Sequence, residues 1–125
     1  MVTSFHGRAL SLAVLTAGFL SFAAASPAAA GPSFSCNGAL NSTERVICAN
    51  AGLSALDREM ANGFQLAVDN ITSEAVGGTE ADVRKFRKEQ KAFLRRRDGC
   101  GSNGACIAAA YRARLVVLDD MNQPE

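Results

Sequence analysis

The chain has 125 residues with 13 Lys plus Arg, 12 Asp plus Glu and one histidine, for a net charge of +1 at pH 7. This length predicts one small domain. The single histidine, His6, lies in a stretch that reads as a leader, so the mature chain lacks the usual general base near neutral pH. Composition therefore argues against an enzyme with a Ser-His or Cys-His nucleophile.

The first thirty residues have the pattern of a secretory signal peptide. A short segment with one cation, residues 1–8, precedes an apolar stretch, residues 9–26, and the small residues 27–30 fit a peptidase site. We expect cleavage after Ala30 and a single mature domain, residues 31–125, in the periplasm or outside the cell. No second apolar stretch follows, so we do not expect a membrane anchor. Cys36 also lacks the small-residue lipobox that lipid attachment needs.

Cleavage removes Arg8, so the mature chain holds twelve cations and twelve acids. It also holds four cysteines, which in an exported domain of this size predict two disulfides. The local pairs, Cys36 with Cys48 and Cys100 with Cys106, are favoured because each closes a short loop beside a helix end. A crossed pairing remains open. The spacings do not fit a zinc site, and we expect neither a metal nor another cofactor.

The remaining segments have helical periodicity. Asn41 followed by Glu44 is typical of a capped helix start and predicts a short helix through Cys48. A longer helix follows, because apolar side chains recur at steps of three and four. These are Leu53, Leu56, Met60, Phe64, Ala67 and Ile71.

After Gly77 and Gly78, Thr79 can cap a third helix with Asp82 in its first turn and Gly99 at its C-terminal end. The last helix is expected over residues 105–121. The prediction is an all-α, disulfide-stapled bundle of three main helices plus a short N-terminal helix.

Charged residues interrupt two of the apolar stripes. Arg97 lies on the stripe of the third helix, and Arg114 lies between Ile107 and Leu118 on the last. A buried guanidinium needs a carboxylate or several carbonyl acceptors. Asp57 is the favoured partner and Asp98 the second. We interpret six residues as one internal polar network: Asp57, Gln90, Arg97, Asp98, Tyr111 and Arg114. A structural role is favoured over a ligand-binding or catalytic one.

Four motifs in this order resemble the lysozyme inhibitor LprI-like domain family. They are SFSC-x11-Cys48, Leu56-Asp57-Arg58-Glu59-Met60, Gln90-x2-Phe93-Leu94-x2-Arg97-Asp98-x-Cys100, and Cys106-Ile107-x3-Tyr111-x2-Arg114-x3-Leu118. The resemblance covers nearly the whole mature chain and implies a helical, exported bacterial protein, with lysozyme inhibition as the activity of the named member. Phe93 and Phe64 stand where many members carry Trp and Tyr. No inhibitory contact residue is carried over.

The predicted surface offers two charged features. A lysozyme inhibitor must compete for the cleft of a cationic enzyme, and the acidic segment of residues 44–82 could supply the contacts. By charge alone, the candidates are Glu59, Asp69, Glu74, Glu80 and Asp82. The third helix carries a basic ridge of Arg84, Lys88, Lys91 and Arg95, which could contact anionic lipid or peptidoglycan. Export argues against nucleic acid as the partner. The sequence therefore leaves two functions open, a non-enzymatic inhibitor that binds lysozyme and an envelope protein that binds peptidoglycan or another envelope component.

Overall fold

The computed structural model describes residues 30–123 and is all-α over that range. It contains four helices: α1 (Ser42–Ala49), α2 (Ala51–Ile71), α3 (Glu80–Asp98) and α4 (Gly104–Met121). This confirms the predicted bundle of three main helices and a short N-terminal one. The predicted leader, apart from Ala30, lies outside the described residues.

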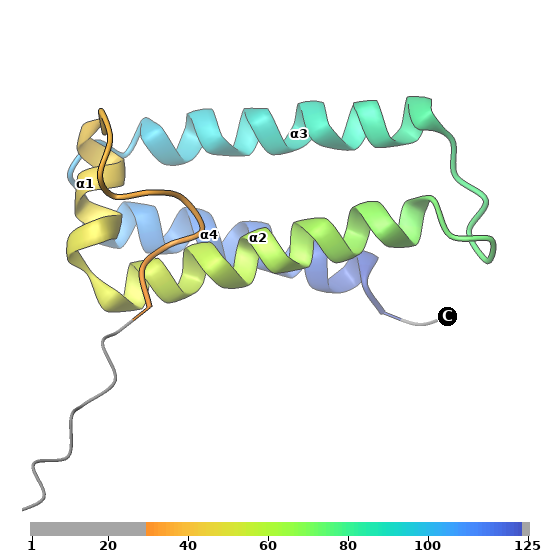
Figure 1. The fold of residues 1–125 in the computed structure, drawn as a ribbon, viewed down its shortest axis with the longest axis horizontal. Helices are drawn as coiled ribbons and strands as arrows, with labels where there is room; N and C mark the ends of the chain where they lie inside the picture. Colours follow the sequence, from red (N-terminus) through yellow and green to blue (C-terminus); the bar gives the residue numbers. More distant parts are fainter. Residues whose placement is uncertain (1–29, 124–125) are drawn as a thin grey trace, which may run out of the picture.

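The three long helices lie side by side, and α1 crosses one end of them (Figure 1). In that view α2 and α4 run in the same direction and α3 runs in the opposite one. The connection between α2 and α3, residues 72–79, projects at the end away from α1. The closest packing is between α2 and α4.

Side-chain caps fix where each helix begins. Asn41 with Glu44, and Thr79 with Asp82, form the two predicted capping boxes at α1 and α3. Two further caps lack the acidic half of that motif: Asn50 accepts from the backbone N–H of Leu53, and Asn103 caps α4. Each cap satisfies amide donors that the first helical turn leaves without partners.

The core follows the predicted stripes, with one shift on α2. On α4, Ile107, Arg114 and Leu118 are buried as predicted, and Tyr111 is buried with them. On α2 the buried face is rotated toward Asp57 and Val68, and the predicted stripe member Phe64 is half-buried. Phe64 stacks on Phe86 with ring centroids 5.0 Å apart. The rotation places a carboxylate, instead of only apolar side chains, against α4.

Both preferred disulfides are present. Cys36–Cys48 ties the segment before α1 to the end of that helix, and Cys100–Cys106 closes the corner between α3 and α4. Gly99 is the C-cap of α3 as predicted but keeps a right-handed conformation. The left-handed residue of this corner is Gly101, with φ of +57°. These two bonds indicate that the protein folds in an oxidising compartment.

Candidate functional site

Asp57 is the centre of a buried hydrogen-bond cluster. One carboxylate oxygen accepts from the Tyr111 hydroxyl at 2.7 Å, and the other accepts from the backbone N–H and hydroxyl of Ser33 at 2.7 and 2.6 Å. The Arg97 guanidinium lies 3.6 Å from the first oxygen. The cluster therefore joins the segment before α1 to α2, α3 and α4.

The Arg97 guanidinium is surrounded by acids and a hydroxyl that accept its hydrogen bonds or pair with its charge. Its Nε and Nη2 atoms donate to Asp98 at 2.9 and 2.7 Å, and Nη1 donates to the Tyr111 hydroxyl at 3.1 Å. Burial alone would lower the pKa of Arg97, but the hydrogen bond to Asp98 and the Tyr111 oxygen outweigh it and raise that pKa. Asp98, ranked second in the sequence prediction, makes the shorter ion pair of the two acids.

Arg114 and Gln90 form a separate pair. Arg114 Nε donates to the amide oxygen of Gln90 at 3.0 Å, and the Gln90 amide nitrogen contacts the Met60 sulfur at 2.9 Å. No hydrogen bond or ion pair between the described residues joins this pair to the Asp57 cluster. The prediction of one six-residue network is therefore wrong, since four members form one cluster and two form another. The expected carboxylate partner of Arg114 is an amide instead.

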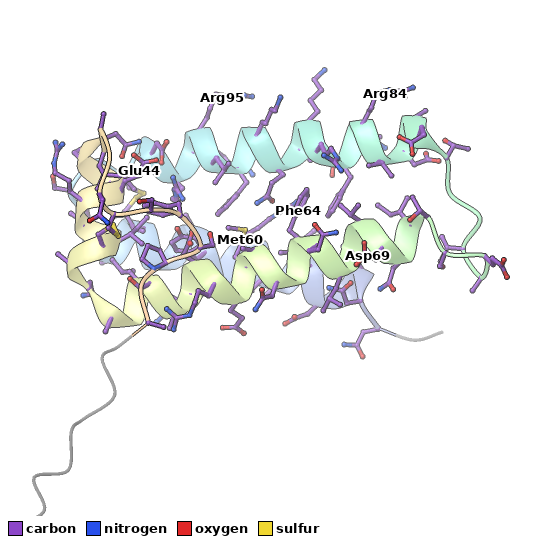
Figure 2. All side chains as sticks on the ribbon, viewed as in Figure 1. Glu44, Met60, Phe64, Asp69, Arg84 and Arg95 are labelled. Carbon is purple, nitrogen blue, oxygen red and sulfur yellow. A yellow bond between two sulfur atoms is a disulfide. The ribbon has the colours of Figure 1, made fainter. Side chains whose placement is uncertain are left out.

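The Asp57 cluster borders a groove of about 370 Å³ between α2 and α3. Its apolar wall includes Phe34, Met60, Phe64 and Leu94, and Figure 2 shows Met60 and Phe64 pointing from α2 toward α3. Ser33, Tyr111 and Arg97 occupy the carboxylate of Asp57, so at this point the groove is bordered by a hydrogen-bonded acid. The cluster links the N-terminal segment and three helices.

The five predicted contact acids are all exposed but do not form one surface. Glu74 lies in the α2–α3 connection and Glu80 directly follows it, while Asp69 lies in the last turns of α2 near the same end (Figure 2). Glu59 lies near the middle of α2, well before this end. The carboxylate of Asp82 is already used in the cap of α3, because it accepts hydrogen bonds from the N–H and hydroxyl of Thr79. These bonds lower the pKa of Asp82.

The α2–α3 connection, here called the acidic loop (residues 72–79), is held by its own hydrogen bonds. The N–H of Gly77 donates to Ser73 O and that of Gly78 to Ile71 O, each at 2.8 Å. Gly77 has a φ of +66°, which glycine adopts without a side-chain penalty. Val76 projects from this loop with 65% of its surface exposed. The loop thus presents an apolar residue between Glu74 and the helix start.

The basic ridge is a continuous exposed surface of α3. Arg84, Lys88, Lys91 and Arg95 are all exposed. Figure 2 shows Arg84 and Arg95 on the edge of α3 that faces away from α2. The ridge is therefore remote from the α2–α3 groove.

Sequence reasoning missed Ser33 and the apolar residue of the acidic loop. Ser33 contributes a backbone donor from a non-helical segment, for which periodicity carries no signal. Val76 stands between Glu74 and two glycines. An apolar side chain in a polar connection was the one sequence signal that it could be an exposed contact residue.

Within residues 30–123, no helix combines the length and apolar character that a bilayer span requires. The same residues contain no group of three or more His, Cys, Asp or Glu side chains placed to hold a metal ion. Comparisons of the chain with protein-family models, curated proteins and solved structures found no match.

Proposed function

We propose that this is an exported, non-enzymatic protein that inhibits a lysozyme by inserting the acidic loop into the cleft of that enzyme. The observation that carries the proposal is the loop itself, which projects from the end of the bundle with exposed Glu74 and Val76 and is followed directly by exposed Glu80 at the start of α3. The resemblance of the cysteine and helix motifs to the lysozyme inhibitor LprI-like family supports the same function.

Rigidity of the loop favours this role. The hydrogen bonds of Gly77 and Gly78 and the capping box of Thr79 with Asp82 hold the loop before any partner binds. A loop that is already ordered loses less conformational entropy on association than a mobile one. The helical core and the two disulfides, which lie at the opposite end of the bundle, would stabilise the scaffold that carries the loop.

Charge supports the same end of the molecule. Lysozyme is cationic, so exposed acids at the edge of the contact would improve the association rate and orient the encounter. The whole mature domain has no net charge, which limits long-range steering, so recognition would depend on the local charge of Glu74, Glu80 and Asp69. The proposed place of action is the periplasm or the medium, after cleavage of the leader.

The oxidised mature protein should be titrated into a lysozyme assay on bacterial cell walls. Neutralising Glu74 and Glu80 together, each to glutamine, should raise the half-inhibitory concentration by roughly 5- to 30-fold if each exposed charge contributes up to about 1 kcal/mol. Glu59→Gln is the matched control, because Glu59 is exposed on α2 but lies well before the end of the bundle that carries the loop. No inhibition of several lysozyme types at high molar excess would sink the proposal.

The basic ridge favours a second candidate function, the binding of peptidoglycan, whose peptides carry carboxylates. The exposed line of Arg84, Lys88, Lys91 and Arg95 is the supporting observation. Sedimentation with purified peptidoglycan tests it. Capture that falls with rising salt and is lost in a Lys88→Gln, Lys91→Gln variant supports this function, and capture that the variant retains argues against it.

A further inference from the structure

The guanidinium of Arg114 is buried without a charged partner. Only 7% of the residue is exposed, and its single hydrogen bond to a described residue goes from Nε to Gln90. The Nη2 atom is buried and has no partner. The guanidinium lies 5.1 Å from the ring centroid of Phe86, a favourable contact that leaves the N–H donors unused.

The contrast with Arg97 shows that this is unusual within the same bundle. Arg97 is buried to a similar degree but has Asp98, Asp57 and Tyr111 around it. In the described part of the chain, no carboxylate lies within ion-pairing distance of Arg114. A buried cation without a counter-charge is costly, so an anionic ligand that reached it would be stabilised by the charge and by the unused N–H donors.

Arg114 lines a groove of about 480 Å³ between α3 and α4. A second arginine, Arg96, lines the same groove and is exposed, and no acid is among its lining residues. The rest of the lining is mostly apolar: Phe93, Ala110, Ala113, Val117 and the Cys100–Cys106 disulfide. Val117 is 46% exposed, so this apolar wall is open to solvent.

The two arginines make the lining of the groove positive, since no acid is among its lining residues. Burial lowers the pKa of Arg114, the carboxylate of Glu89 opposes that effect, and the charge of Arg96 lowers the pKa further. Because Arg96 and Arg114 line the same groove, an anion bound there could accept hydrogen bonds from both.

We propose that the α3–α4 groove binds a monocarboxylate with an apolar tail, of the size of a medium-chain fatty acid. The carboxylate would bind Arg96 and Arg114, and the tail would lie on Phe93, Ala113 and Val117. The volume falls in the range of roughly 300–1,000 Å³ that is usual for small-molecule sites, which are mostly apolar with a few convergent polar groups. This site is separate from the acidic loop and does not depend on the inhibitor function.

Isothermal titration of the oxidised mature protein with three probes separates charge from apolar contact. Octanoate, kept below its micelle concentration, should bind with a 1:1 stoichiometry. Octanol has the chain without the charge, and acetate has the charge without the chain, so each should bind at least about tenfold more weakly. Octanol binding as tightly as octanoate would overturn the proposal, as would no binding of octanoate.

Two variants locate the site. Arg96→Gln changes an exposed residue and should raise the Kd for octanoate by roughly 5- to 10-fold, and Arg114→Met should raise it by roughly 10-fold or more. Arg95→Gln is the matched control on the basic ridge and should stay within about twofold. If Arg95→Gln weakens binding as much as Arg96→Gln, the attraction is general and the site is refuted. Should Arg114→Met fail to fold, the comparison of Arg96→Gln with Arg95→Gln still decides.

Discussion

Replacing Asp57 by alanine removes the acceptor on which several parts of the bundle converge. Its carboxylate takes hydrogen bonds from Ser33 and Tyr111 and lies 3.6 Å from Arg97. The side chain is only 1% exposed, so water cannot take over these roles without entering the core. The three partners come from the N-terminal segment, α4 and α3.

The expected loss is large. Removing one partner of a buried ion pair costs about 3–5 kcal/mol, because the other charge stays buried and uncompensated. Arg97 keeps its ion pair with Asp98, which places the loss of stability toward the lower part of that range. The Tyr111 hydroxyl and the two Ser33 donors would be left without an acceptor, which increases the loss. A domain of this size is stable by about 5–15 kcal/mol, so Asp57→Ala should remove a substantial share of that.

Urea unfolding of the oxidised protein, followed by far-ultraviolet circular dichroism, measures the loss. Thermal melting should show a fall in Tm of at least about 12 °C, at about 4 °C or more for each kcal/mol. Glu59→Ala is the matched control, because Glu59 is an exposed acid two residues later on the same helix, and it should change stability by less than about 0.5 kcal/mol.

A loss below about 1 kcal/mol in Asp57→Ala would refute the reasoning, since the cluster would then be dispensable for docking the helices. Equal losses in Asp57→Ala and Glu59→Ala would refute it as well. Asp57→Asn tests the charge separately. The amide keeps an acceptor for Tyr111 but turns a donor toward Ser33, so its stability should lie between those of the wild type and the alanine variant.

Three further predictions concern other parts of the bundle. Burial and the hydrogen bond to Asp57 hold the pKa of Tyr111 well above its usual range. The unfolded chain therefore loses this proton near pH 10 while the folded protein keeps it, and stability should fall as pH rises above about 10. The absorbance of the phenolate reports this group alone, because the chain has one tyrosine. Replacing Cys36 and Cys48 by serine opens a loop with a sequence separation of 12 and should cost about 3 kcal/mol in urea unfolding. Gly78→Ala should cost about 1–3 kcal/mol and speed amide exchange in the acidic loop, because its Cβ would meet Ile71 O at 2.3 Å.

Each of these three has an outcome that would contradict it, and two have a control variant. Tyr111→Phe should remove the part of the fall in stability above about pH 10 that comes from this group. A phenolate that forms at the ordinary pKa of tyrosine in the folded protein would contradict the prediction. For the cysteine pair, a loss under about 1 kcal/mol contradicts the chain-entropy reasoning. Gly38→Ala is the matched control for the loop, since a Cβ there meets nothing within 4 Å, and wild-type exchange rates in Gly78→Ala would contradict the clash.

Much of the secondary structure was predictable because its determinants are local. Asn41 with Glu44 and Thr79 with Asp82 lie three residues apart, so a capping box is visible in the sequence. Asn50 also caps a helix, but no acid follows at the matching position, and its cap was recognisable only in the structure. The two disulfides close short loops, which made the local pairing the favoured one.

The polar interior was predictable only in part. The stripe positions of Arg97 and Arg114 showed that both guanidiniums point inward, and that prediction is confirmed. Their partners depend on how far α2, α3 and α4 are displaced along one another, which a periodic pattern does not specify. The displacement brings Asp57 to Tyr111 and leaves Arg114 with Gln90 alone.

The sequence by itself determined the helices, the capping boxes of α1 and α3, the short disulfide loops and the buried side of α3 and α4, because these depend on residues within a few turns of one another. The tertiary structure decided which acid meets which arginine, the clamp of Ser33 on Asp57 and the unpaired guanidinium in the α3–α4 groove. The hydrogen bonds of Asp57 join it to Ser33, 24 residues earlier in the chain, and to Tyr111, 54 residues later. Their geometry is set by the packing of three helices at once, and no single stretch of the sequence carries that information.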